Sequence, residues 1–143
     1  MRQRSTVEVF EDHLALAQEG ELEADLIRNV ATDIVLLTTY GVFRGYDWVR
    51  QAAALLERQI GRTTYTYRNR QCHGNHAFLE WSAETELGTI DDGADSYLIR
   101  DGRIQSMTIH YTVRARPRRR RPVSAPLIQA RYLSASGPKW SRG

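Results

Sequence analysis

The sequence predicts an α+β fold in which N-terminal helices cover one face of a curved antiparallel sheet. Apolar residues recur at helical spacing up to Gly61, and the spacing changes to that of strands from Thr63 onward. The second half also contains Asp101-Gly102, a strong signal for a two-residue hairpin turn. Helices that come first, followed by a meander of strands, are typical of this fold class.

Three amphipathic helices are predicted. The first covers residues 5–19 and ends at Gly20, and its apolar positions are Val7, Phe10, Leu14 and Ala17. The second covers residues 21–31, with apolar positions Leu22, Leu26 and Val30. The third is capped by Asp47 and ends at Gly61, and it carries Trp48, Ala52, Leu55 and Leu56 on one side.

The strands are predicted from apolar runs and from alternation. Short runs at 34–37 and 42–43 lie between the second and third helices. Longer strands are expected at 63–73, 76–87, 94–100 and 103–113, with turns at 74–75, 90–93 and 101–102.

The predicted turn at 101–102 implies a register for the last hairpin. Arg100 is expected to face Arg103, and because side chains alternate, one face carries Asp95, Tyr97, Ile99, Ile104, Ser106, Thr108 and His110. Asp95 and His110 are then diagonal neighbours within reach of side-chain contact. A carboxyl and an imidazole on a largely apolar face suit acid–base chemistry, and the alternative is a buried polar pair that only satisfies its own hydrogen bonds.

Further candidates lie outside this hairpin. His13 follows Phe10 by one helical turn, at the edge of the apolar stripe, where it either points at a ligand oxygen or stays at the surface. Several aromatic residues are candidates to line an apolar pocket, or else belong to the ordinary core: Tyr40, Trp48, Trp81 and Tyr97. No metal site is expected, because His73 and His76 lack an obvious third ligand.

The charge is divided unevenly along the chain. Residues 114–143 hold nine basic residues and no acidic one, together with all four prolines. We therefore expect a domain at 1–113 and a disordered Arg/Pro-rich tail at 114–143. The domain itself is acidic, which argues against nucleic acid as a partner.

One cysteine excludes a disulfide framework, and no apolar run reaches the length of a membrane span, so a cytoplasmic protein is expected.

Taken together, several short motifs resemble the SnoaL-like branch of the nuclear transport factor 2-like superfamily. They are Gly20-Glu21-Leu22, Asp33-Ile34-Val35, Gly45-x-Asp47 and Gly93-x-Asp95 followed by Arg100-Asp101-Gly102-Arg103-Ile104. The resemblance covers about residues 5–113 and implies a cone-shaped sheet that wraps three helices around a pocket, often in a homodimer. It also implies that Asp95 and His13 stand where ketosteroid isomerases of this superfamily place oxyanion-hole donors. Thr38 stands at or near their general base, which argues against ketosteroid isomerisation.

The predicted function is therefore a small pocket enzyme that moves protons without a cofactor, as a cyclase, isomerase or dehydratase does. Its substrate is expected to be a mainly apolar, oxygen-bearing metabolite, with Asp95, His13 and His110 as catalytic residues. The alternative is a binding module of the same fold that holds a ligand or a partner protein without catalysis.

Overall fold

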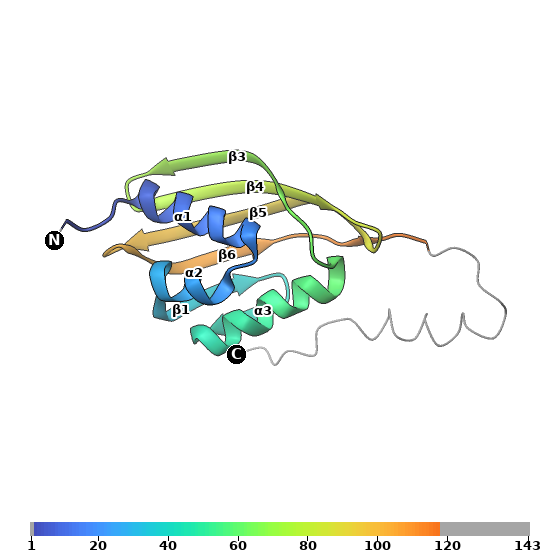
Figure 1. The fold of residues 1–143 in the computed structure, drawn as a ribbon, viewed down its shortest axis with the longest axis horizontal. Helices are drawn as coiled ribbons and strands as arrows, with labels where there is room; N and C mark the ends of the chain where they lie inside the picture. The colour runs from blue at the N-terminus through green and yellow to red at the C-terminus, as the bar shows by residue number, and fades with distance from the viewer. Residues whose placement is uncertain (1, 118–143) are drawn as a thin grey trace.

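The computed structural model describes residues 2–117, and it has three helices lying against one face of a curved sheet (Figure 1). In chain order the elements are α1 (Thr6–Glu19), α2 (Leu22–Asn29), β1 (Val30–Thr38), β2 (Gly41–Arg44), α3 (Gly45–Ile60), β3 (Thr66–His73), β4 (His76–Glu84), β5 (Gly88–Arg100), β6 (Arg103–His110) and β7 (Arg114–Ala115). The α+β prediction is confirmed. Most of the predicted tail, residues 118–143, lies outside the described residues, and β7 is formed by two residues assigned to that tail.

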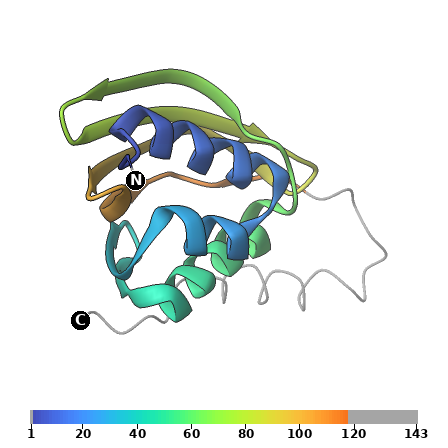
Figure 2. The same ribbon diagram turned by 60° about the vertical axis from the view of Figure 1, so that its left-hand side comes forward.

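The sheet has the strand order β2-β1-β6-β5-β4-β3, and β7 pairs with β5. The prediction that the whole sheet is antiparallel is wrong at one place, because β1 and β6 run parallel. Parallel neighbours need a long connection, and here α3 and four strands separate β1 from β6 along the chain. The sheet stays open and bends over the helices, as Figure 2 also shows.

Local signals set the helix ends. Ser5 and Glu8 form a reciprocal capping box at the start of α1, and Gly20 ends it in the left-handed conformation with a φ of 73°. Helix α2 stops at Asn29, and the chain enters β1 directly at Val30, earlier than the sequence predicts. Asp47 lies in the first turn of α3 and is not its cap.

Strand β5 is continuous and passes through residues 90–93, which the sequence predicts as a turn. A bulge shifts its ladder with β4 between the pairs Trp81–Gly93 and Ala83–Ile90. A Cβ atom on Gly93 would lie 2.3 Å from Trp81 Cδ2, so only glycine permits this close approach of the strand to the indole.

A second bulge makes the predicted register of the last hairpin wrong beyond its first pairs. Ile99 faces Ile104 as expected, but Gln105 is an extra residue, so that Leu98 faces Ser106 and Tyr97 faces Met107. One inserted residue exchanges the two faces of a strand. The inner face of the sheet therefore carries Asp95 and Tyr97 with Met107 and Ile109, whereas Ser106, Thr108 and His110 lie on the outer face.

The core fills the space between the helices and the inner face. Its largest fully buried apolar side chains are Phe10, Phe43, Leu14, Leu26, Ile34, Ile60, Ile90, Ile99 and Ile104. Helix α1 packs on β4 and β5, while α3 packs on β1 and β2. This arrangement leaves a hollow between α1, α2, α3 and the sheet, in which the candidate site lies.

Candidate functional site

A cavity of about 600 Å³ opens between the three helices and the inner face of the sheet. Its volume falls within the range of pockets that hold small organic ligands. Most of its wall is apolar, contributed by residues such as Leu22, Leu26, Ile34, Leu36, Phe43, Val49, Leu55, Leu56 and Ile109. Polar side chains interrupt this wall at a few places, and the first of them is His13 on α1.

His13 forms a pair with Asp25, which lies in the first turn of α2. His13 Nδ1 lies 2.7 Å from Asp25 Oδ2, and both residues line the cavity. A carboxylate accepts hydrogen bonds, so Nδ1 of His13 carries a hydrogen. In the neutral ring, Nε2 is then the nitrogen with a free lone pair.

Nε2 is the other ring nitrogen of His13, a residue of the cavity wall. Nε2 has no hydrogen-bond partner among residues 2–117. In this part of the chain every fully buried side-chain nitrogen and oxygen has a partner, so Nε2 is not fully buried. The atom is therefore accessible, although the His13 side chain as a whole is only 13% exposed. An oriented imidazole with one free nitrogen in an apolar cavity is a suitable base or proton shuttle.

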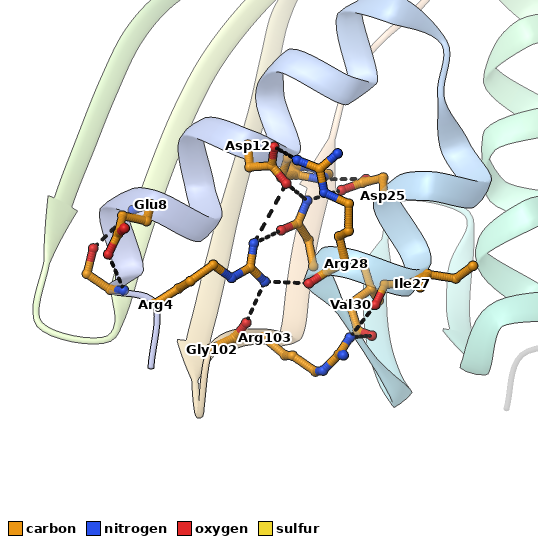
Figure 3. Close-up of polar contacts among 12 residues, drawn as sticks. Arg4, Glu8, Asp12, Asp25, Ile27, Arg28, Val30, Gly102 and Arg103 are labelled. Carbon is orange, nitrogen blue, oxygen red and sulfur yellow. Dashed lines mark hydrogen bonds and ion pairs between the residues drawn. The ribbon is translucent and has the colours of Figure 1, made fainter. Parts of the chain in front are cut away.

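Asn29 holds Asp25 in place. Figure 3 shows the polar network around Asp25, Asp12 and Arg4 to which this contact belongs. Asn29 is fully buried, and its Nδ2 donates to Asp25 Oδ1 and to Asp12 Oδ2, both at 2.9 Å. Its Oδ1 accepts from Arg4 Nη1 at 2.8 Å, and Arg4 also donates to the carbonyl of Gly102 at 3.0 Å. The network ties α1, α2, the chain before α1 and the β5–β6 hairpin together, so the carboxylate beside His13 has a fixed orientation.

Asp95 lies behind the cavity wall and is 9% exposed. Trp81 Nε1 donates to its Oδ1 at 3.0 Å, and the Tyr97 hydroxyl donates to its Oδ2 at 3.2 Å. Burial raises the pKa of the Asp95 carboxyl to about 6, against the opposing effects of Trp81, His13 and Tyr97. The rings of His13 and Tyr97 pack edge-to-face, with 5.4 Å between ring centroids, so the imidazole and the Asp95 carboxyl are both neighbours of Tyr97.

The structure separates His110 from the other two candidates. Because of the bulge at Gln105, His110 lies on the outer face of the sheet, and its side chain is 60% exposed. It contacts Asp92 at 3.4 Å and Thr39 at 3.3 Å. The expected meeting of Asp95 and His110 is therefore wrong, whereas Asp95 and His13 do come together through Tyr97.

The four predicted lining residues have different positions. Tyr40 lines the cavity, while Trp81 and Tyr97 are buried behind its wall. Trp48 is 37% exposed, packs edge-on against Phe43 and lies outside the wall.

Asp25 and Asn29 were not among the residues predicted for the site. They are four residues apart and lie on the face of α2 that also carries Leu26, so two polar side chains interrupt an apolar stripe. This spacing is the sequence signal that identifies them. Within residues 2–117, no three histidine, cysteine or carboxylate side chains gather as metal ligands, and no helix is long and apolar enough to cross a membrane.

Comparison with known proteins identifies the fold. No protein-family model matches the chain, and no curated protein matches its sequence. An NTF2-like protein of unknown function from Cytophaga hutchinsonii superposes with a TM-score of 0.60 at 14% identity, covering 78% of this chain and 93% of that one. A protein described as a SnoaL-like polyketide cyclase from Mesorhizobium loti gives 0.55 at 15%, covering 76% and 100%.

TerC, crystallised with polyporic acid, gives a TM-score of 0.62 at 16% identity and covers 75% of this chain and 91% of its own. At these identities the matches establish the fold and carry no activity over.

Proposed function

The chain has the nuclear transport factor 2-like fold that SnoaL-like proteins share, and from this premise we propose that it is a proton-transfer enzyme. Its substrate is a mainly apolar, oxygen-bearing small molecule, and its own side chains supply the chemistry. The observation that carries the proposal is the accessible Nε2 of His13, in a ring oriented by Asp25, inside an apolar cavity.

His13 is the proposed catalytic residue. Its Nε2 takes a proton from a carbon next to a substrate carbonyl, and Asp25 stabilises the imidazolium that forms. The imidazolium then returns the proton to another carbon or to an oxygen. Isomerisation consists of these two proton transfers. In a cyclisation the enolate first attacks a second carbonyl carbon, whose oxygen takes the proton. In a dehydration the proton goes to the hydroxyl that leaves as water.

Asp95 is a positioning residue, which acts on the same proton transfer through His13. Its pKa of about 6 leaves it mainly ionised at neutral pH, so a negative charge lies near the imidazole of His13. Tyr97 lies between the two groups, since it hydrogen-bonds the carboxyl and packs against the imidazole.

The described neighbours support the ligand class. One carries the description of a polyketide cyclase, and another was crystallised with polyporic acid. The homodimer and the cytoplasmic location expected from the sequence stay predictions.

Deuterium exchange into a simple ketone tests the proposal without knowledge of the substrate. The protein is incubated with 1-tetralone in D₂O, and loss of the C2 hydrogens is followed by proton NMR. We expect exchange faster than in buffer and a fall of about 100-fold or more in His13→Gln, the range of a lost general base. His110→Gln is the matched control, because this histidine lies on the outer face, and it should exchange at the wild-type rate.

A binding module of the same fold is the second candidate. It is favoured by the position of Asp95, whose two oxygens are already hydrogen-bonded behind the wall. Tight binding of 1-tetralone by calorimetry, with exchange no faster than in buffer, would contradict the enzyme proposal and leave this one. Equal exchange by wild type and His13→Gln would remove His13 from the mechanism.

A further inference from the structure

A second group of polar side chains lies at the same cavity, away from His13, and two of its three members line the wall. Tyr40 lies in the turn between β1 and β2, Gln59 in the last turn of α3, and Tyr111 directly after β6. Gln59 Nε2 donates to the Tyr40 hydroxyl at 3.0 Å, and the Tyr111 hydroxyl donates to Gln59 Oε1 at 2.6 Å. Both tyrosines belong to the cavity wall, with ring centroids 5.6 Å apart.

The three hydrogen-bonded side chains hold one hydroxyl hydrogen more than they can accept among themselves. One amide offers a donor to one hydroxyl and an acceptor to the other, which uses one of the two hydroxyl hydrogens. The remaining O–H belongs to Tyr40 in the observed arrangement, and it would belong to Tyr111 if the amide were turned over. Neither hydroxyl has another partner among residues 2–117, so one oriented donor is left at the cavity wall.

The donor suits a neutral acceptor. Burial raises the pKa of the Tyr111 hydroxyl, so Tyr111 stays protonated at neutral pH. The one arginine among the described lining residues, Arg62, is 88% exposed and paired with Glu57. A carboxylate brought to the two tyrosines would be desolvated without a cation, which is costly, whereas a carbonyl oxygen needs only the hydrogen bond.

The position of the two tyrosines excludes that they bind the carbonyl oxygen next to the carbon that His13 deprotonates. From Tyr40 the contacts run through Tyr111 to Trp81 at 5.8 Å between ring centroids, then to Asp95, Tyr97 and finally His13. Several side chains therefore separate the hydroxyl pair from the imidazole. One small carbonyl group cannot contact both, although an elongated ligand can.

We propose that the hydrogen-bond chain of Tyr40, Gln59 and Tyr111 is a second polar subsite, which binds a carbonyl oxygen remote from the reacting carbon. The substrate class is then an elongated apolar molecule with two oxygen functions, one at His13 and one at the tyrosine pair. This inference rests on the proposed function, since it assumes that the ligand fills the cavity that His13 lines.

Two matched probes test the subsite by affinity alone. They are 6-acetyl-1-tetralone and 6-isopropenyl-1-tetralone, which differ in one carbonyl oxygen replaced by a CH₂ group. Calorimetry should show the acetyl probe binding about fivefold more tightly to the wild-type protein, as one neutral hydrogen bond allows. The preference should disappear in the Tyr40→Phe/Tyr111→Phe double variant and fall in Tyr40→Phe, which keeps a readout if the double variant does not fold.

Tyr65→Phe is the matched control, because it removes a hydroxyl from the same cavity but leaves Tyr40, Gln59 and Tyr111 intact. This variant should keep the preference for the acetyl probe. A preference absent from the wild type, retained in the double variant, or lost in Tyr65→Phe overturns the subsite. Failure of both probes to bind overturns it as well. The affinity ratio is independent of C2 exchange, so the proton-transfer proposal can fail while the subsite stands, and the reverse also holds.

Discussion

Replacing Asp95 with asparagine isolates the cost of burying this carboxyl. Burial raises its pKa from a usual value of 3.8 to about 6. A carboxyl with a higher pKa in the folded than in the unfolded protein stabilises the fold below its unfolded pKa, and this contribution is lost as the pH rises through the folded pKa. A difference of about two pH units corresponds to about 3 kcal/mol, so above pH 6 the ionised Asp95 destabilises the fold by that order.

Asp95→Asn should therefore be more stable than the wild type by about 3 kcal/mol at pH 8, and the difference should shrink to below about 1 kcal/mol at pH 4. The amide keeps an acceptor oxygen for Trp81, and its NH₂ can donate to Tyr97. Urea unfolding at both pH values measures the difference. Repeating it in a His13→Gln background removes the histidine whose charge acts on Asp95. A variant that is less stable than the wild type at pH 8, or a difference that does not change with pH, would refute the reasoning.

Two further substitutions test the packing around the site. Gly93→Ala places a Cβ 2.3 Å from the indole of Trp81, which is restrained by its hydrogen bond to Asp95. Urea unfolding should therefore show a free energy of unfolding lower by about 1–3 kcal/mol. An unchanged midpoint would contradict the close approach of the bulged strand to the indole. Asn29→Leu removes the partner of two carboxylates and a guanidinium, and it should cost at least about 3 kcal/mol in the same assay; a loss below about 1 kcal/mol would mean that the network does not hold Asp25.

The helices and the last hairpin turn were predictable because their signals are local. Gly20 and the Asp101-Gly102 turn act over a few residues, and the structure has both where the sequence indicates them. The bulges were not predictable by alternation. A glutamine such as Gln105 does not mark an inserted position in the sequence. This one inserted residue moved His110 to the other face of the sheet.

The site was predictable only in part for a similar reason. His13 and Asp95 lie on regular elements, and periodicity places each of them beside apolar residues of its own element. Asp25 contacts His13 across two helices, and the turn between α1 and α2 that sets this contact has no periodicity to interpret. The parallel pairing of β1 with β6 was missed because it joins segments far apart in the chain.

The protonation of His13 tests the central claim most directly. Nitrogen-15 NMR of the histidine-labelled protein separates the two neutral tautomers. The structure predicts a hydrogen on Nδ1, held by Asp25, and an unprotonated Nε2 whose resonance moves when 1-tetralone is added. A hydrogen on Nε2 in the neutral ring, or an Nε2 resonance that ignores the bound ketone, would contradict the account of His13 as the base in the cavity.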